Sequence, residues 1–100
     1  MRPIHLARID KTRPVLILTR EQVRPFLNSI TVAPITSTIR GLSTEVPVGK
    51  ANGLSHDSVI SCDNIITIPR ATIGRLLGYL QPTQEPLLAN AITAAFDLDL

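Results

Sequence analysis

The chain has few of the residues that build cross-linked or metal-bound cores: one cysteine, two histidines and no tryptophan in 100 residues. Cys62 has no second cysteine to pair with, so an intramolecular disulfide is excluded, and its surroundings predict a small buried residue in a strand. His5, His56 and Cys62 do not follow a spacing typical of zinc ligands. We therefore expect neither a metal nor another cofactor.

Long hydrophobic runs are also absent. No segment approaches the roughly 20 consecutive apolar residues of a membrane-spanning helix. The first residues, Met1-Arg2-Pro3-Ile4-His5, are followed by charges where a signal peptide would carry its apolar region. The sequence predicts a cytoplasmic protein.

Catalytic signatures that spacing alone can reveal are missing. The chain has no glycine-rich phosphate loop, no carboxylate pair at a fixed spacing and no nucleophile motif of the Gly-x-Ser-x-Gly type. Ser55, His56 and Asp57 are the residue types of a hydrolase triad, but neighbours in sequence cannot face one another as a triad must. Residue types and spacing alone therefore do not indicate an enzyme.

The chain does have enough apolar residues to fold. Hydrophobic residues make up 44% of it and charged residues 18%, which at this length predicts a single domain over residues 1–100. Residues 1–40 hold seven basic and two acidic residues, a net charge of +5, whereas residues 41–100 hold three basic and six acidic residues, a net charge of −3. This split fits a basic face for a polyanion, and equally an ordinary solvated surface.

Short apolar runs between turn residues predict a mostly β chain. Strands are expected over residues 4–9, 15–18, 28–35 and 44–48, the last at a sheet edge because Pro47 cannot donate to a neighbouring strand. Residues 58–69 give the longest β signal, and the polar pair Asp63-Asn64 interrupts it as a bulge or a site would. Residues 50–53 form a turn, since Asn52-Gly53 tolerates positive φ.

Three helices are expected among these strands. Thr19 is a plausible N-cap for a short helix over residues 20–26. Residues 71–80 show helical spacing despite two glycines, and a clearer helix begins near Thr83, has Pro86 in its first turn and stops near Phe96. The apolar positions of the former are Ile73, Leu76, Leu77 and Leu80, and those of the latter are Leu87, Leu88, Ala91, Ile92, Ala95 and Phe96. The whole predicts a small, strongly bent antiparallel sheet or barrel with a C-terminal helix.

The segment from Val32 to Leu42 holds the features most suggestive of function. Four largely apolar residues run into the hydroxyl cluster Thr36, Ser37 and Thr38, so a buried strand ends in a polar loop. The sequence Ala-Pro-Ile-Thr, followed by Ser-Thr-Ile-Arg-Gly-Leu-Ser-Thr-Glu-Val, resembles the middle of the MazF/PemK family of toxin endoribonucleases. The upstream Thr-Arg-Pro-Val-Leu-Ile-Leu-Thr of residues 12–19 resembles the first conserved segment of that family.

The resemblance implies a fold, an activity and partners. The expected fold is a small SH3-like antiparallel β-barrel with a C-terminal α-helix, typically in a homodimer. The expected protein is the toxin of a type II toxin-antitoxin system, neutralised by a small MazE-like antitoxin. Its activity would be sequence-specific, metal-independent cleavage of single-stranded RNA, which inhibits translation and growth.

Two residues match the catalytic positions of the family. Arg13 stands directly before Pro14, which restricts its backbone to extended geometry, and a guanidinium binds phosphate through a two-pronged fork. By default Arg13 would be a surface arginine and Thr36 a turn hydroxyl, but the resemblance makes them the catalytic pair. It implies attack by the RNA's own 2′-hydroxyl, giving 2′,3′-cyclic phosphate and 5′-hydroxyl ends. Arg13 would stabilise the phosphorane and protonate the leaving oxygen, while Thr36 orients the phosphate.

Four further residues are candidates for RNA binding: Thr38 and Arg40 for the RNA backbone, and Asp63 and Asn64 for the bases. The chain departs from the family at Ile66, where relatives have an RNA-binding arginine, and in the short link over residues 10–13, where relatives have a longer loop. Both departures predict altered sequence preference or weaker affinity. With three aromatic residues in the chain, recognition would rest on hydrogen bonds and charge rather than on stacking.

Two alternatives stay open. A CcdB-like toxin has a similar fold and binds its target without enzymatic activity, but that activity depends on a C-terminal Trp-Gly-Ile, and this chain ends Phe-Asp-Leu-Asp-Leu. An inactive family member could persist as a regulator or dimer partner, as Ile66 and the short link would allow. For a dimer, Leu76, Leu77, Leu80 and the last helix are the expected surface.

Overall fold

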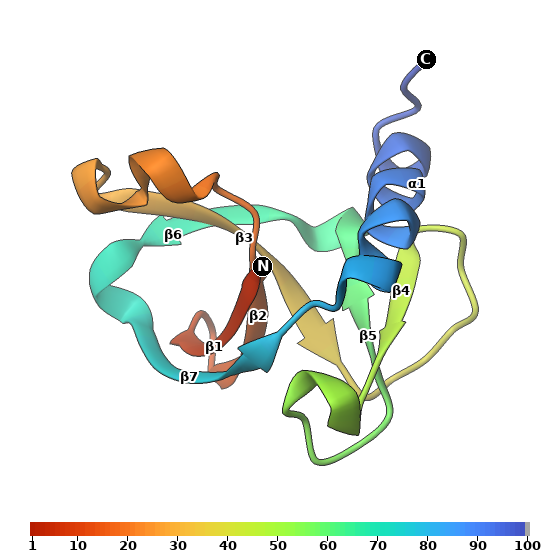
Figure 1. The fold of residues 1–100 in the computed structure, drawn as a ribbon, viewed down its shortest axis with the longest axis horizontal. Coiled ribbons are helices and arrows are strands. Elements are labelled where there is room, and N and C mark those ends of the chain that lie inside the picture. The colour runs from red at the N-terminus through yellow and green to blue at the C-terminus, as the bar shows by residue number, and fades with distance from the viewer. Residues whose placement is uncertain (100) are drawn as a thin grey trace.

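The computed structural model describes residues 1–99 and consists mainly of strands (Figure 1). The strands are β1 (Pro3–Arg8), β2 (Thr12–Ile17), β3 (Ser29–Thr36), β4 (Glu45–Val48), β5 (Ser58–Ser61), β6 (Ile66–Pro69) and β7 (Ile73–Tyr79). The 3₁₀ helices are η1 (Glu21–Phe26), η2 (Lys50–Asn52), η3 (Cys62–Asn64), η4 (Arg70–Thr72) and η5 (Pro82–Gln84), and the α-helix is α1 (Glu85–Ala95). No helix of the described chain has the length and apolar content needed to cross a membrane.

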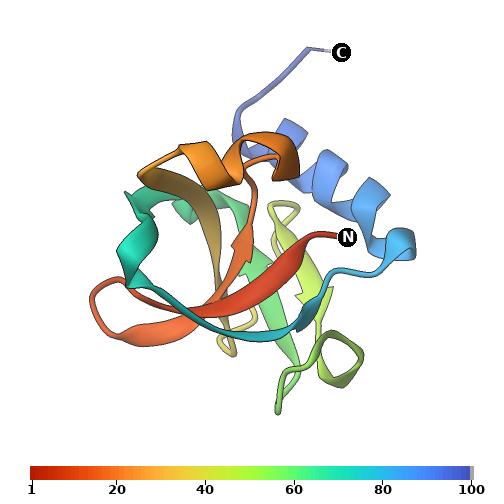
Figure 2. The same ribbon diagram turned by 60° about the vertical axis from the view of Figure 1, so that its left-hand side comes forward.

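All strand pairs are antiparallel, and the sheet curls into a half-barrel (Figures 1 and 2). The strand order is β4-β5-β3-β2-β1-β7, and β6 pairs with β3 beside β5. β3 therefore has β2 along one edge and, on the other, β6 along its first half and β5 along its last residues. The C-terminal end of β3 is therefore placed by its pairings with β2 and β5, and its first half by β2 and β6.

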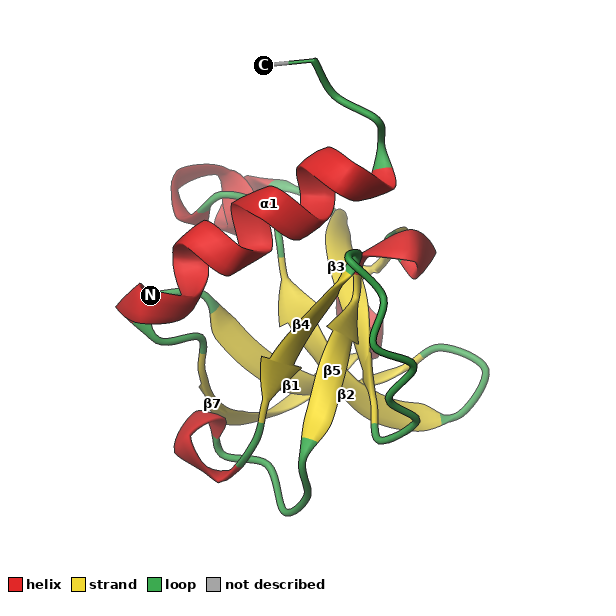
Figure 3. Ribbon diagram, turned by 90° about the vertical axis from the view of Figure 1, so that its right-hand side faces the viewer, coloured by secondary structure: helices red, strands yellow, loops and turns green. Residues whose placement is uncertain are grey.

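Apolar side chains cover both faces of the central strands. Along β3, alternate residues join two different clusters, because successive side chains of a strand point to opposite faces. One cluster, which includes Ala33 and Ile35, is covered by α1 through the buried Leu88 and Ala91 (Figure 3). The other is on the opposite face: Ala7, Val15, Ile17, Ile30, Val32 and Ile68. This second face leads to the polar residues described below.

The predicted strands are confirmed, with bounds shifted by a few residues, but the helix expected over residues 71–80 is wrong. That segment contains η4 and β7, and β7 pairs with β1 in a register that has two irregularities. Gly74 and Gly78 disfavour a helix. Gly78 also packs against the backbone of Asn52, where an added Cβ would collide with the Asn52 carbonyl.

The buried side chain of Asn52 fixes this contact between η2, β7 and η5. Its amide nitrogen donates to the Tyr79 carbonyl at 2.9 Å and to Gln84 Oε1 at 2.7 Å. Its oxygen accepts from the Gly49 backbone at 3.0 Å, and Gly53 follows with φ of 85°. The predicted Asn-Gly turn is thus confirmed.

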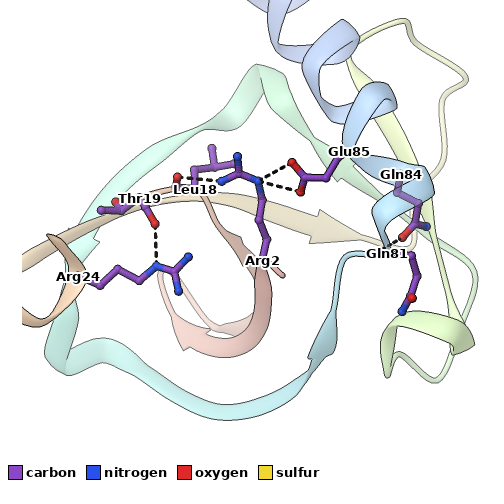
Figure 4. A network of polar contacts seen from close by, with 7 residues as sticks. All are labelled: Arg2, Leu18, Thr19, Arg24, Gln81, Gln84 and Glu85. Carbon is purple, nitrogen blue, oxygen red and sulfur yellow. Dashed lines mark hydrogen bonds and ion pairs between the residues drawn. The ribbon is translucent and has the colours of Figure 1, made fainter. Parts of the chain in front are cut away.

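A second polar network joins the first strand to the last helix (Figure 4). Arg2 Nε donates to both carboxylate oxygens of Glu85, at 3.2 and 3.0 Å, and Nη1 donates to the Leu18 carbonyl at 3.1 Å. Nearby, Thr19 does not cap the short helix as predicted. Its hydroxyl instead accepts from the Thr31 backbone at 2.8 Å, because Thr19 follows β2 and lies beside β3. The helix η1 follows Arg20 without a side-chain cap.

The C-terminal helix is confirmed with Pro86 in its first turn and Phe96 as its C-cap. Its predicted apolar face is only partly correct: Leu88 and Ala91 are buried, whereas Leu87 and Phe96 are exposed. Leu80, predicted to contribute to a dimer surface, is 1% exposed in the core and cannot do so.

Candidate functional site

One cleft is lined by all six of the catalytic and RNA-binding candidates predicted from the sequence. It has a volume of about 400 Å³ and opens where β2 begins and β3 ends. Its lining residues are Arg13, Pro34, Thr36, Thr38, Arg40, Leu42, Glu45, Ser61, Asp63 and Asn64. The two catalytic candidates and the four RNA-binding candidates therefore share one surface.

The register between β2 and β3 explains why Arg13 and Thr36 meet. Val15 is paired with Pro34, and continuing this antiparallel register by two residues sets Arg13 opposite Thr36. Arg13 lies on the same face as the buried Val15, and Thr36 on the same face as Pro34, because side chains alternate along a strand. The apolar face of the sheet thus ends in a polar pair.

The guanidinium of Arg13 is held from one side only. Its Nη2 lies 3.0 Å from both carboxylate oxygens of Asp10, three residues earlier in the β1–β2 turn. Its Nε is buried and has no hydrogen-bond partner among residues 1–99. A buried N–H without a partner costs free energy, and an anion bound against this edge of the guanidinium would relieve that cost.

Asp10 is itself well suited to stay ionised. The backbone amides of Lys11 and of Asp10, and then the charges of Arg13 and Lys11, lower the pKa of the Asp10 carboxyl below its ordinary value. The turn that carries it is short, since three residues separate β1 from β2. The prediction of a short first link is confirmed.

The Thr36 hydroxyl has its proton free. Its oxygen accepts a hydrogen bond from the Thr38 backbone at 3.1 Å, as in the turns that threonine favours at strand ends. A hydroxyl that accepts one bond retains its own proton for another partner. Thr36 is half-buried, so it can present this proton to a ligand in the cleft.

The loop of residues 37–44 is tied to the cleft through Glu45. One oxygen of this carboxylate accepts from the backbone of Arg40 at 3.2 Å and of Leu42 at 3.1 Å. The Arg40 side chain lines the cleft and is exposed. The loop therefore presents a cation whose backbone is fixed by a neighbouring strand.

Asp63 and Asn64 belong to η3, the turn between β5 and β6. Of the two predicted alternatives, a bulge or a site, the bulge is wrong, because β5 and β6 pair with different parts of β3 and this turn joins them. Asp63 accepts from the Thr44 hydroxyl at 2.6 Å, and the Asn64 amide donates to Ser61 at 2.7 Å. Each still has an exposed polar atom left for a ligand.

Cys62 begins the same turn and points into the core. It is 1% exposed and lies in a 3₁₀ helix rather than in the predicted strand. Burial, and then the charge of Asp63, raise the pKa of the Cys62 thiol to about 11. Such a thiol is a packing residue, not a nucleophile. Within residues 1–99 no three His, Cys, Asp or Glu side chains gather in a way that could hold a metal ion.

Comparison with known proteins assigns the family. The profile of the family described as "PemK-like, MazF-like toxin of type II toxin-antitoxin system" matches residues 3–96. The chain belongs to this family. It is 66% identical over 99 residues to "Endoribonuclease MazF3" of Mycobacterium tuberculosis (strain ATCC 25618 / H37Rv), an alignment that covers 99% of this chain and 96% of the relative. It is 37% identical over 73 residues to "Probable endoribonuclease MazF2" of the same strain, which covers 72% of each protein.

Solved structures agree with this assignment. "Mycobacterium tuberculosis toxin MazF-mt6" superposes with a TM-score of 0.97 at 65% identity and covers 99% of this chain and 100% of that one. MazF from Deinococcus radiodurans superposes with a TM-score of 0.78 at 16% identity, covering 97% and 94% of the two chains, and shows the common fold. The predicted fold class, a small antiparallel β-barrel of the MazF/PemK type with a C-terminal helix, is confirmed.

Two residues that help to shape this MazF/PemK-type cleft were not predicted from the sequence. Asp10 binds Arg13 directly, and its position three residues before Arg13 was a signal that could have revealed it. Glu45 acts on backbone amides of a loop, and no sequence pattern marks such a contact. Ile66, the departure from the family pattern, is 42% exposed and lines a side cleft with Arg13 and Asn64.

Proposed function

We propose that this protein is an endoribonuclease of the MazF type, the toxin of a type II toxin-antitoxin system. The observation that carries the proposal is the pair of unused donors on Arg13 and Thr36, side by side at one cleft. The relative that is 66% identical, named an endoribonuclease, supports it. In this proposal residues 1–100 form a single toxin domain that acts in the cytoplasm.

The reaction is transesterification within single-stranded RNA. The 2′-oxygen forms a bond to phosphorus while the bond from phosphorus to the 5′-oxygen breaks. The 2′-hydroxyl loses its proton to solvent and the 5′-oxygen gains one from Arg13, which solvent then reprotonates, and the products are a 2′,3′-cyclic phosphate and a 5′-hydroxyl. No metal takes part in these steps.

Arg13 and Thr36 divide the work at phosphorus. Arg13 donates to the phosphoryl oxygens through Nε and through Nη2, which also bonds to Asp10. These bonds stabilise the charge that develops on the oxygens. Thr36 donates its free hydroxyl proton to a phosphoryl oxygen and orients it. Asp10 is a positioning residue, because it touches the guanidinium rather than the RNA.

The remaining residues of the cleft bind the strand around the cut. Arg40 and Thr38 contact phosphates and sugars, and Asp63 and Asn64 read base edges by hydrogen bonds. Single-stranded RNA fits this arrangement because its 2′-hydroxyls and base edges are exposed. A homodimer and an antitoxin that covers the cleft complete the proposed system.

The test is incubation of the purified protein, in EDTA, with a long single-stranded RNA whose cut ends are mapped. Discrete cuts that carry 5′-hydroxyl ends are expected. Arg13→Ala should abolish them, whereas Arg8→Ala, at an exposed arginine of β1 outside the cleft, should leave them unchanged. A substrate with a single 2′-deoxynucleotide at the mapped position should resist the cut, because it lacks the attacking oxygen.

Intact RNA would overturn the nuclease proposal. If Arg13→Ala then still inhibited growth in cells, the nuclease proposal would give way to the hypothesis of a CcdB-like toxin that acts by binding alone. If the wild-type protein neither cut RNA nor inhibited growth, the inactive family member would replace it.

A further inference from the structure

A second cavity lies behind the catalytic pair. Its volume is about 300 Å³, and it shares Arg13 and Thr36 with the main cleft, so these two residues form the boundary between two spaces. The second cavity is lined by Lys11, Arg13, Pro14, Ile35, Thr36, Ser37, Leu54, Ser55, His56 and Ser58.

The two spaces differ in chemistry. In the main cleft the charges of Arg13 and Arg40 are offset by the carboxylates of Glu45 and Asp63, which accept from base amino groups but repel phosphate. The second cavity is lined by Lys11, by Arg13 and by several hydroxyl residues, and no Asp or Glu among residues 1–99 lines it. A phosphate is therefore favoured more strongly in the second cavity than in the first, where acceptors for base edges lie beside Arg40.

Two hydrogen bonds order the part of the second cavity that residues 55–58 line. The His56 ring accepts or donates through Nδ1 to the Ser55 hydroxyl at 2.8 Å, and the Ser58 hydroxyl donates to the His56 carbonyl at 3.1 Å. The ring is exposed, and its Nε2 makes no hydrogen bond within residues 1–99. A planar ring with a free nitrogen can stack on a base or bond to a ribose hydroxyl.

A strand that places its scissile phosphate between Arg13 and Thr36 has to continue on both sides of that phosphate. One side lies in the main cleft, and the other enters the space that the same two residues border. We propose that the second cavity is an RNA subsite for the nucleotide adjoining the cut, in which Lys11 binds the next phosphate and His56 contacts the sugar or base. This inference rests on the proposed function.

Lys11 can be replaced without disturbing the turn. Its backbone amide donates to Asp10 at 2.9 Å and its carbonyl accepts from the Ile9 amide at 3.1 Å, whereas its side chain is exposed. Lys50 offers a matched control, because it is an exposed lysine in η2 that lines neither cavity. Lys11→Gln and Lys50→Gln thus remove the same charge at two places.

The experiment measures single-turnover cleavage of a short RNA containing the mapped cut site, over a range of protein concentrations. Lys11→Gln and His56→Ala should each raise the half-saturating concentration about tenfold, as expected for the loss of one contact of about 1.4 kcal/mol. The maximal rate should stay within about threefold, since neither residue touches the reacting phosphate. For Lys11→Gln the slope of log affinity against log salt should fall by about 1.

Truncation of the substrate locates the contact. RNAs shortened one nucleotide at a time from either end should reach a length, on one side of the cut only, at which wild-type protein and Lys11→Gln become equal. If both variants match Lys50→Gln on the full substrate, or if their defect survives truncation from both sides, the subsite is refuted. A wild-type protein that cuts no RNA would instead refute the proposed function, so the two failures are distinguishable.

Discussion

The hydroxyl of Thr36 offers a sharp test of the proposed chemistry, because its role is to donate a single proton. Thr36→Val keeps the shape and the β-branch of the side chain and removes only the oxygen. Since that oxygen accepts from the exposed Thr38 amide, water can satisfy the amide in the variant. The free energy of unfolding should therefore fall by less than about 1 kcal/mol.

The catalytic loss should be much larger than the loss of stability. A hydrogen bond to a charged group contributes about 1.5 to 3 kcal/mol, which corresponds to about 10- to 150-fold in rate. Because the bond strengthens as charge develops on the phosphoryl oxygens, the loss should appear in the maximal single-turnover rate rather than in the half-saturating concentration. Thr36→Ser, which restores the hydroxyl, should regain most of the rate.

The assay compares these variants with Thr93→Val, a change of the same kind on α1, where the hydroxyl donates to the Ala89 carbonyl and has no other partner among residues 1–99. Melting temperatures measured in parallel separate catalysis from folding. Full activity in a folded Thr36→Val protein would refute the role of the hydroxyl. A Thr36→Ser variant as slow as Thr36→Val would do the same.

Two further predictions concern stability. Asn52→Ala removes the buried side chain that bonds to the Gly49 amide and the Tyr79 carbonyl. The free energy of unfolding, measured by urea denaturation, should therefore fall by about 3 kcal/mol. A change below about 1 kcal/mol would contradict this prediction. The Cys62 thiol, whose pKa is raised from 9.0 to about 11, is neutral in the folded state at a pH where the unfolded thiol ionises. Its contribution is complete below pH 9.0 and is lost as pH rises toward about 11, so wild-type stability should fall across this range more steeply than that of Cys62→Ala.

The parts of the fold that the sequence predicts well depend on local patterns. The apolar runs of β2 and β3 mark buried strands, and Pro86 marks the start of α1 because proline is favoured in a first helical turn. The candidate site residues were found through motifs that lie within single segments. Each of these signals is contained in fewer than about a dozen neighbouring residues.

The parts that the sequence misses depend on distant partners. Residues 73–79 have helical spacing, but they form β7 because β1, at the other end of the chain, pairs with them. Gly78 also packs against the backbone of Asn52, which leaves no room for a side chain. Thr19 has the chemistry of a cap, and it bonds to Thr31 because the pairing of β2 with β3 places that amide nearer. Tertiary contacts override propensity in both cases.

The site itself depends on one such distant relation, the register of β2 against β3. A shift of this register by one residue would turn Arg13 to the face covered by α1 and away from Thr36, because side chains alternate along a strand. That shift would also turn Val15 and Ile17 out of their cluster, so the buried pairs that stabilise the sheet are the same ones that align the two donors. The geometry of the proposed catalytic pair thus follows from hydrophobic packing two residues away, and a truncation of Val15 should lower both the free energy of unfolding and the rate of RNA cleavage.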